Sequence, residues 1–160
     1  MSTWSKLLAM LDASAVAAAM RGSIWLYPAV EVVHIVGFSV LVGSVAMFDL
    51  RVLGFGRSVA VLAAARMLLP WSIISLLAIV PAGLLLFSAH PNELSVNKIF
   101  QLKLCLIALA GLNALSFHLG VYRTVATWNA RAPALAQLHT AASLVLWTGV
   151  ISCGRFLAYT

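Results

Sequence analysis

Hydrophobic positions along the chain form four long runs that are separated by short polar connectors. The runs cover about residues 24–50, 68–88, 99–125 and 135–159. Each run is long enough to cross the ~30 Å hydrocarbon core of a bilayer as a helix. The connectors carry the glycines, prolines and charged residues that end helices. The pattern predicts an all-α integral membrane protein in which residues 23–160 form a bundle of four transmembrane helices.

Residues 1–22 have a different pattern and do not make a convincing span. Leucines recur there at helical spacing, while Lys6 and Asp12 lie on another side of the same helix. An amphipathic helix lying on the membrane surface is expected from such a segment. Asp12 also interrupts the short apolar run that most resembles a signal-peptide core, so we expect the N-terminus to be retained.

Composition supports the membrane assignment and excludes a water-soluble domain. Hydrophobic residues make up 63% of the chain and charged residues 9%, with a mean hydropathy of +1.05, whereas soluble domains are about 25% charged. The net charge is +6, but the cations stand singly between apolar runs and do not form a basic face. The expected partner is therefore the lipid bilayer, and no nucleic acid is expected.

Four spans place both termini on one side of the membrane, called side A here, together with the loop around His90. The other two loops lie on side B. The arginines on or beside side B are Arg51, Arg57, Arg66, Arg123 and Arg131, and the cations flanking side A are Lys6, Arg21 and Lys98. Because positive charge favours the cytoplasmic side, side B is predicted to be cytoplasmic.

Titratable residues inside the spans are the first candidates for function, because each costs roughly 2.5–3.5 kcal/mol near the bilayer centre. At about 100° per residue, one stripe of the first span carries Tyr27, Glu31, His34, Phe38, Val45 and Asp49. This stripe should face the interior of the bundle. Depth from side A then predicts a buried polar cluster of Glu31, His34, Lys103 and Arg155. The cluster could instead be a structural ion pair, and its two cations could extend to the headgroups.

His118 and His139 are candidates for holding a cofactor. Counted from side B, they lie ~10 Å and ~6 Å deep on consecutive helices. Two imidazoles at matched depth can ligate a b-type haem, and His34 is a further candidate for cofactor binding. The alternative is that the histidines form hydrogen bonds with the backbone or with Asn113, Ser116 and Ser143.

Copper is the second cofactor that the sequence suggests, and it is less favoured than haem. Cys105, Cys153 and Met47 are soft ligands, but no Met-x-x-Met or Cys-x-x-Cys spacing concentrates them. His34 with Cys153 would be the most plausible pair of ligands. The two cysteines offer neither a disulfide framework nor a zinc motif.

The chain resembles a family of short bacterial four-span membrane proteins classified as a domain of unknown function. The motifs that carry the resemblance are Trp25-Leu26-Tyr27-Pro28, Glu31 with His34, Asp49-Leu50-Arg51, Leu69-Pro70-Trp71, Leu102-Lys103-Leu104, Phe117-His118 and Gly154-Arg155. A looser similarity, through His34-Ile35-Val36-Gly37, is to copper-resistance D-type membrane proteins. The resemblance implies a multi-pass protein of the bacterial inner membrane, and with side B cytoplasmic both termini would be periplasmic.

Three functions remain open from the sequence. The first, which we favour at this point, is a haem-b-type or metal-handling redox component that works with a redox or metal-handling partner protein. The second is a cofactor-free scaffold or anchor subunit that associates with a partner or with itself. The third is a small proton-linked transporter in which Glu31 and His34 change protonation. The sequence contains no recognisable catalytic constellation, such as a nucleophile elbow, a phosphate-binding glycine loop or a zinc-protease helix.

Overall fold

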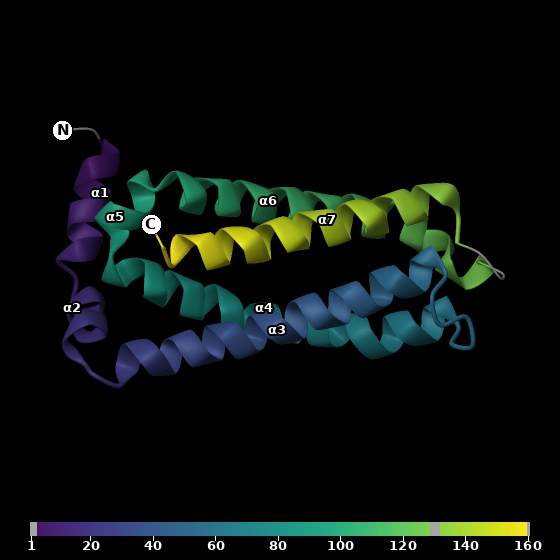
Figure 1. The fold of residues 1–160 in the computed structure, drawn as a ribbon, viewed down its shortest axis with the longest axis horizontal. Coiled ribbons are helices and arrows are strands. Elements are labelled where there is room, and N and C mark those ends of the chain that lie inside the picture. The colour runs from purple at the N-terminus through teal and green to yellow at the C-terminus, as the bar shows by residue number, and fades with distance from the viewer. Residues whose placement is uncertain (1–2, 129–131, 160) are drawn as a thin grey trace.

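Four long helices dominate the structure, a computed structural model that describes residues 3–128 and 132–159. They are α3 (Leu26–Leu53), α4 (Val61–Ala89), α6 (Lys98–Leu119) and α7 (Ala134–Leu157). All four are long and apolar enough to cross a membrane. The described residues contain no strand, and both ends of the chain lie at the same end of the bundle (Figure 1). The predicted all-α four-helix membrane bundle is therefore confirmed.

Four shorter elements cover the two ends of the bundle. At side A lie α1 (Thr3–Asp12), α2 (Ala15–Gly22) and α5 (Pro91–Val96), and at side B lies the 3-10 helix η1 (Val121–Thr127). Figure 1 shows α1 and α2 running across the end of the bundle, transverse to the long helices. They replace the single helix that the leucine spacing predicts. The break lies at Ser14, whose hydroxyl group accepts a hydrogen bond from the Ala17 N–H and so begins a new helix.

The N-terminal helices are fixed to the bundle by burial and by one arginine. Ala17 and Met20 of α2 are almost completely buried, and α2 packs mainly against α4. The Arg21 guanidinium donates hydrogen bonds to the Asp12 carboxylate, to the Asp12 carbonyl oxygen and to the Ala89 carbonyl oxygen at the end of α4. These three bonds join the α1–α2 break to the side A end of α4.

Two of the long helices have bounds that differ from the predicted spans. Helix α4 begins at Val61, well before residue 68, because its first turns are buried in the side B core. Helix α6 ends at Leu119, before residue 125. The next residue is Gly120, where a Cβ would lie 3.0 Å from the Ser116 carbonyl oxygen, and the chain tightens there into η1. Arg131, predicted on side B, lies outside the described residues.

The long helices are arranged as two hairpins. The α3 and α4 backbones run close together, as do those of α6 and α7, and α3 lies against α7 to join the hairpins. Small residues allow the close approaches: a Cβ on Gly37 would lie 2.9 Å from Ile79 Cγ1, and a Cβ on Gly149 would lie 3.1 Å from Leu106 Cδ1. These close approaches lie within the hairpins. The two hairpins are joined to each other by the contact between α3 and α7 and by larger side chains.

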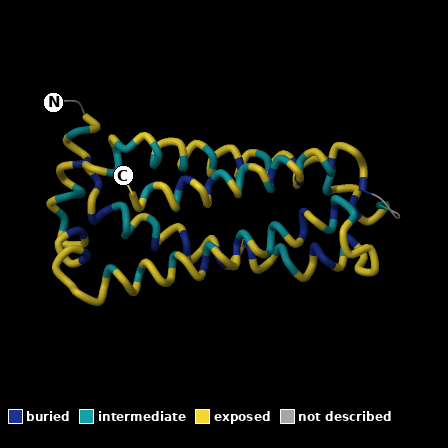
Figure 2. The backbone as a smooth tube through the Cα atoms, in the orientation of Figure 1, coloured by how far each residue is buried: buried dark blue, intermediate teal, exposed yellow. Residues whose placement is uncertain are grey.

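Aromatic side chains bridge the two hairpins. Phe38 of α3 meets Trp147 of α7 edge to face at 6.0 Å between ring centroids. Near side A, Phe87 of α4 stacks on Phe100 of α6 at 5.6 Å. The main hydrophobic core lies near side B and consists of Phe48, Val52, Val61, Ala65, Phe117, Val125, Ala132 and Ala136. Most residues on the outside of the long helices are exposed (Figure 2), and many of them are large and apolar, as expected where lipid covers them.

Candidate functional site

The polar stripe of α3 faces the other helices over much of its length. Phe38 contacts α7, His34 contacts α4, and Asp49 is buried. Tyr27 and Glu31, on the same stripe, lie closer to side A, where Tyr27 is half-buried and Glu31 is exposed. The stripe therefore passes from an open end near side A to a closed end near side B.

His34 occupies a place on α4 that Gly83 leaves free. Its Nδ1 lies 3.1 Å from the Ile79 carbonyl oxygen. Because a carbonyl oxygen only accepts, Nδ1 is the donor and Nε2 keeps its lone pair or a second proton. A Cβ on Gly83 would lie 3.1 Å from His34 Cε1, so a larger residue there would press on the ring. Local packing accounts for the position of His34.

The predicted cluster near side A assembles only in part. Lys103 of α6 reaches α7, where its Nζ lies 3.7 Å from the Cβ position of Gly154. It is also close enough to His34 and to Cys153 for electrostatic interaction. Three helices thus bring an imidazole, an ammonium group and a buried thiol into one region.

Glu31 and Arg155, the other two members of that predicted cluster, have different surroundings. Glu31 is exposed, interacts electrostatically with Tyr27 and forms no ion pair with any described residue. Arg155 is also exposed, donates a hydrogen bond to the Tyr159 hydroxyl group and lies 4.6 Å from the centroid of that ring. The structural ion pair that the sequence left open as an alternative therefore does not include Glu31 among the described residues.

The two histidines near side B are oriented by separate hydrogen bonds. His118 is exposed, and its Nδ1 donates to the Ala114 carbonyl oxygen one turn earlier at 2.8 Å. His139 is half-buried and pairs with Asn113: its Nδ1 lies 2.8 Å from Asn113 Oδ1, and Asn113 Nδ2 donates to the His139 carbonyl oxygen at 2.9 Å. Hydrogen bonding to the backbone and to Asn113 was the alternative that the sequence left open.

This arrangement does not fit a haem clamped between the two imidazoles. The ring of Phe117, only 4% exposed, contacts both of them, at 5.4 Å from His118 and 6.0 Å from His139 between centroids. A flat macrocycle would have to displace this core side chain before both histidines could reach its iron. Haem binding stays a prediction from the sequence.

The soft ligands suggested for copper are spread over the molecule. Cys105 and Met47 are exposed, whereas Cys153 is buried. His34 and Cys153 share Lys103 as a neighbour. Across residues 3–128 and 132–159, no three His, Cys, Asp or Glu side chains are grouped closely enough to hold a metal ion. The copper pair also stays a prediction.

Asp49 is the polar group whose surroundings are least explained by packing. It lies on α3 near side B and is 4% exposed. The hydroxyl group of Ser143 on α7 interacts with its carboxyl group. The carboxyl atom Oδ2 is buried without a hydrogen-bond partner, and Asp49 forms no ion pair within the described part of the chain. Asp49 lies on the inward stripe that the sequence predicts, but it was not among the predicted site residues. The available signal was its position on that stripe.

Comparisons with protein-family models, with curated proteins and with solved structures found no match.

Proposed function

We propose that the protein is a small proton-linked membrane transporter in which Asp49 takes up and releases the proton. The observation that carries this proposal is the burial of the Asp49 carboxyl group with an unpartnered oxygen and no cation beside it among the described residues. A carboxylate in such a place has only the Ser143 hydroxyl group to offset its desolvation cost, and a bound proton removes that cost.

The position of Asp49 links its charge to the packing of the two hairpins. Asp49 belongs to α3 and Ser143 to α7, so they face each other across the contact that joins the hairpins. Loss of the proton would place a negative charge beside a neutral hydroxyl group in this interface. Water or a change in hairpin packing would then have to solvate the charge, which couples proton binding to helix movement.

Titratable groups also lie near side A, beyond an apolar middle section. Along α3, His34 and Asp49 are separated by about 22 Å of helix. Buried Leu41 and Val150 and the Phe38–Trp147 contact lie between the two levels. This distance is too long for direct proton transfer. The proposed transporter therefore opens its interior first to one side of the membrane and then to the other, by movement of one hairpin against the other.

The proposal can be tested without knowing the transported solute. We expect liposomes containing the protein and an internal pH indicator to take up protons when a membrane potential is imposed, because a carrier that also changes conformation without its solute moves protons alone. Asp49→Asn should remove this uptake, and Asp49→Glu should retain part of it. Glu93→Gln is the matched control, because Glu93 lies in α5 outside the spans with an exposed side chain. Infrared spectroscopy should show a protonated carboxylic acid band in the unmodified protein that Asp49→Asn removes.

Other outcomes would favour the other functions. Equal proton uptake by the unmodified protein and Asp49→Asn would contradict the proposal. A Soret band in the same preparation that is lost in His118→Ala would favour the haem-dependent redox component. If Asp49→Asn changed only assembly or stability, with no protein-dependent uptake in any sample, the scaffold would be the better explanation.

A further inference from the structure

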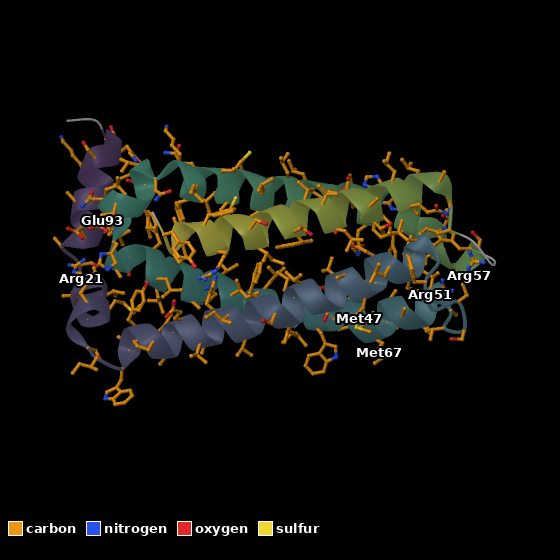
Figure 3. All side chains as sticks on the ribbon, viewed as in Figure 1. Arg21, Met47, Arg51, Arg57, Met67 and Glu93 are labelled. Atoms are coloured by element: carbon orange, nitrogen blue, oxygen red, sulfur yellow. The ribbon has the colours of Figure 1, made fainter. Side chains whose placement is uncertain are left out.

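A small cavity of about 160 Å³ opens at the side B end of the bundle. It lies between the end of α3, the loop that follows and the start of α7, and its polar lining comes from Arg51, Arg57 and Gln137. Figure 3 shows Arg51 and Arg57 together at the end of the molecule opposite Arg21. Neither arginine has a role in the function proposed above.

The loop brings the two arginines together because of two glycines. Gly54 ends α3 with φ +108°, and Gly56 follows with φ +62°. Both values lie in the left-handed region that glycine adopts without steric cost. A Cβ on Gly54 would lie 3.5 Å from Arg57 Nη2, so the second guanidinium folds back closely over the end of the helix that carries the first.

In each guanidinium the Nε atom donates a hydrogen bond to the backbone, and the terminal Nη atoms have no hydrogen-bond partner among the described residues. Arg51 Nε donates to the Val59 carbonyl oxygen, and Arg57 Nε donates to the Gly54 carbonyl oxygen at 3.1 Å. The Nη atoms of both arginines form no hydrogen bond with any described residue. Two oriented donor pairs of this kind match the oxygens of a phosphate group.

The charge around the cavity also favours an anion. No acidic side chain is found among the described residues that line it. The neighbouring Asp49 is buried inside the bundle and does not belong to the lining. The cavity lies where α3 ends, at the level at which the headgroups of a surrounding bilayer begin.

We infer that this cavity binds the phosphate group of an anionic phospholipid, with Arg51 and Arg57 as its ligands. The chemistry it recognises is a phosphoester with a net negative charge at the membrane surface, which phosphatidylglycerol has and zwitterionic phosphatidylcholine lacks. A bound headgroup would fix the loop after α3 to the side B leaflet, which carries the anionic lipid if side B is cytoplasmic.

The test compares lipid binding by the complete protein in two kinds of lipid nanodisc. Native mass spectrometry after release should show bound phosphatidylglycerol from mixed nanodiscs and little bound phosphatidylcholine from neutral ones. Arg51→Gln with Arg57→Gln should lower the bound phosphatidylglycerol by about tenfold or more. Arg66→Gln with Arg123→Gln is the matched control, because it removes the same charge from exposed positions near side B that do not line the cavity.

A second arm separates the two sources of a phosphoester. Glycerol phosphate is titrated into the protein in neutral nanodiscs. If the lipid headgroup is the ligand, glycerol phosphate should bind only weakly in these nanodiscs. That weak binding should be lost in Arg51→Gln with Arg57→Gln, as the binding of phosphatidylglycerol is. Binding of glycerol phosphate without any preference for phosphatidylglycerol over phosphatidylcholine would overturn the lipid assignment. Equal lipid binding by both double variants, with unchanged thermal stability, would overturn the site itself.

Discussion

At the scale of single residues, glycines of the long helices differ in what faces them. Gly37 meets Ile79 across the α3–α4 contact, Gly83 meets His34, and Gly149 meets Leu106. Gly43 and Gly111 have nothing within 4 Å of a Cβ position. Of these five glycines, only the first three have a close neighbour, so the effect of a methyl group should depend on position: a steric cost at those three, and only the helix propensity of alanine at Gly43 and Gly111.

Gly37→Ala should therefore destabilise the bundle by about 1–3 kcal/mol, because the new methyl group overlaps Ile79 and must push α3 and α4 apart. Thermal unfolding of the detergent-solubilised protein measures the change. Gly43→Ala is the control on the same helix, and it should leave stability equal or slightly higher because alanine favours the helix. Equal melting temperatures for both variants would contradict the close contact at Gly37.

The candidate site could be predicted from the sequence only in part. The periodicity of α3 correctly turned His34, Phe38 and Asp49 inward, because a helix fixes the angular position of every side chain. It could not distinguish Glu31, which shares their stripe but is exposed near side A. It also could not foresee that Phe117 would fill the space between His118 and His139, because packing across helices depends on their rotation about their own axes.

At the scale of elements, the N-terminal helices show how few contacts attach a segment to a bundle. Helix α1 has only Leu8 buried, and α2 has Ala17 and Met20. Arg21 adds the polar connection to Asp12 and to the end of α4. Because the apolar contact is small, this one side chain should contribute much of the order in the segment.

Arg21→Ala should thus speed amide hydrogen exchange in α1 and α2 while leaving α6 and α7 unchanged. Mass spectrometry of peptides from the exchanged protein in detergent measures the difference. Lys6→Ala is the matched control, since Lys6 is an exposed cation of α1. Unchanged exchange in α1 and α2 after loss of Arg21 would show that burial of α2 alone holds the segment.

The elements were easier to predict than their ends. Four apolar runs gave four helices because only a helix satisfies its backbone hydrogen bonds in lipid. Helix ends depend on single side chains and on tertiary contacts: Asn97 caps α6 by accepting from the Ile99 and Phe100 N–H groups, and burial of Val61 extends α4. Such contacts leave little trace in hydrophobic periodicity.

At the scale of the whole molecule, the two ends of the bundle differ in charge and covering. Side A carries the transverse α1 and α2 and both termini (Figure 1), whereas side B carries the cavity lined by Arg51 and Arg57, which Figure 3 labels at that end. The arginines of side B favour a cytoplasmic position for that end. The structure and the charge distribution together lead to a prediction for the orientation of the chain.

We expect alkaline phosphatase fused after Thr160 to be active in a bacterial host, and green fluorescent protein fused there to be dark, because both termini would be periplasmic. Fusions after Gly120, which follow three spans, should give the opposite pattern. Reporter activity normalised to protein level is the measurement. A fluorescent fusion after Thr160 would reverse the assignment of the two sides.

The lengths of the four spans have a consequence for the surrounding lipid. Helices α3 and α4 contain 28 and 29 residues and are about 42 Å and about 44 Å long, whereas α6 and α7, with 22 and 24 residues, reach about 33 Å and about 36 Å. A hydrocarbon layer of about 30 Å nearly matches the shorter pair but not the longer one. The extra length of the longer pair therefore has to be taken up by tilt, by a thicker bilayer on its flank or by extension beyond the hydrocarbon layer, and the exposed Arg66 near the start of α4 indicates such extension for that helix.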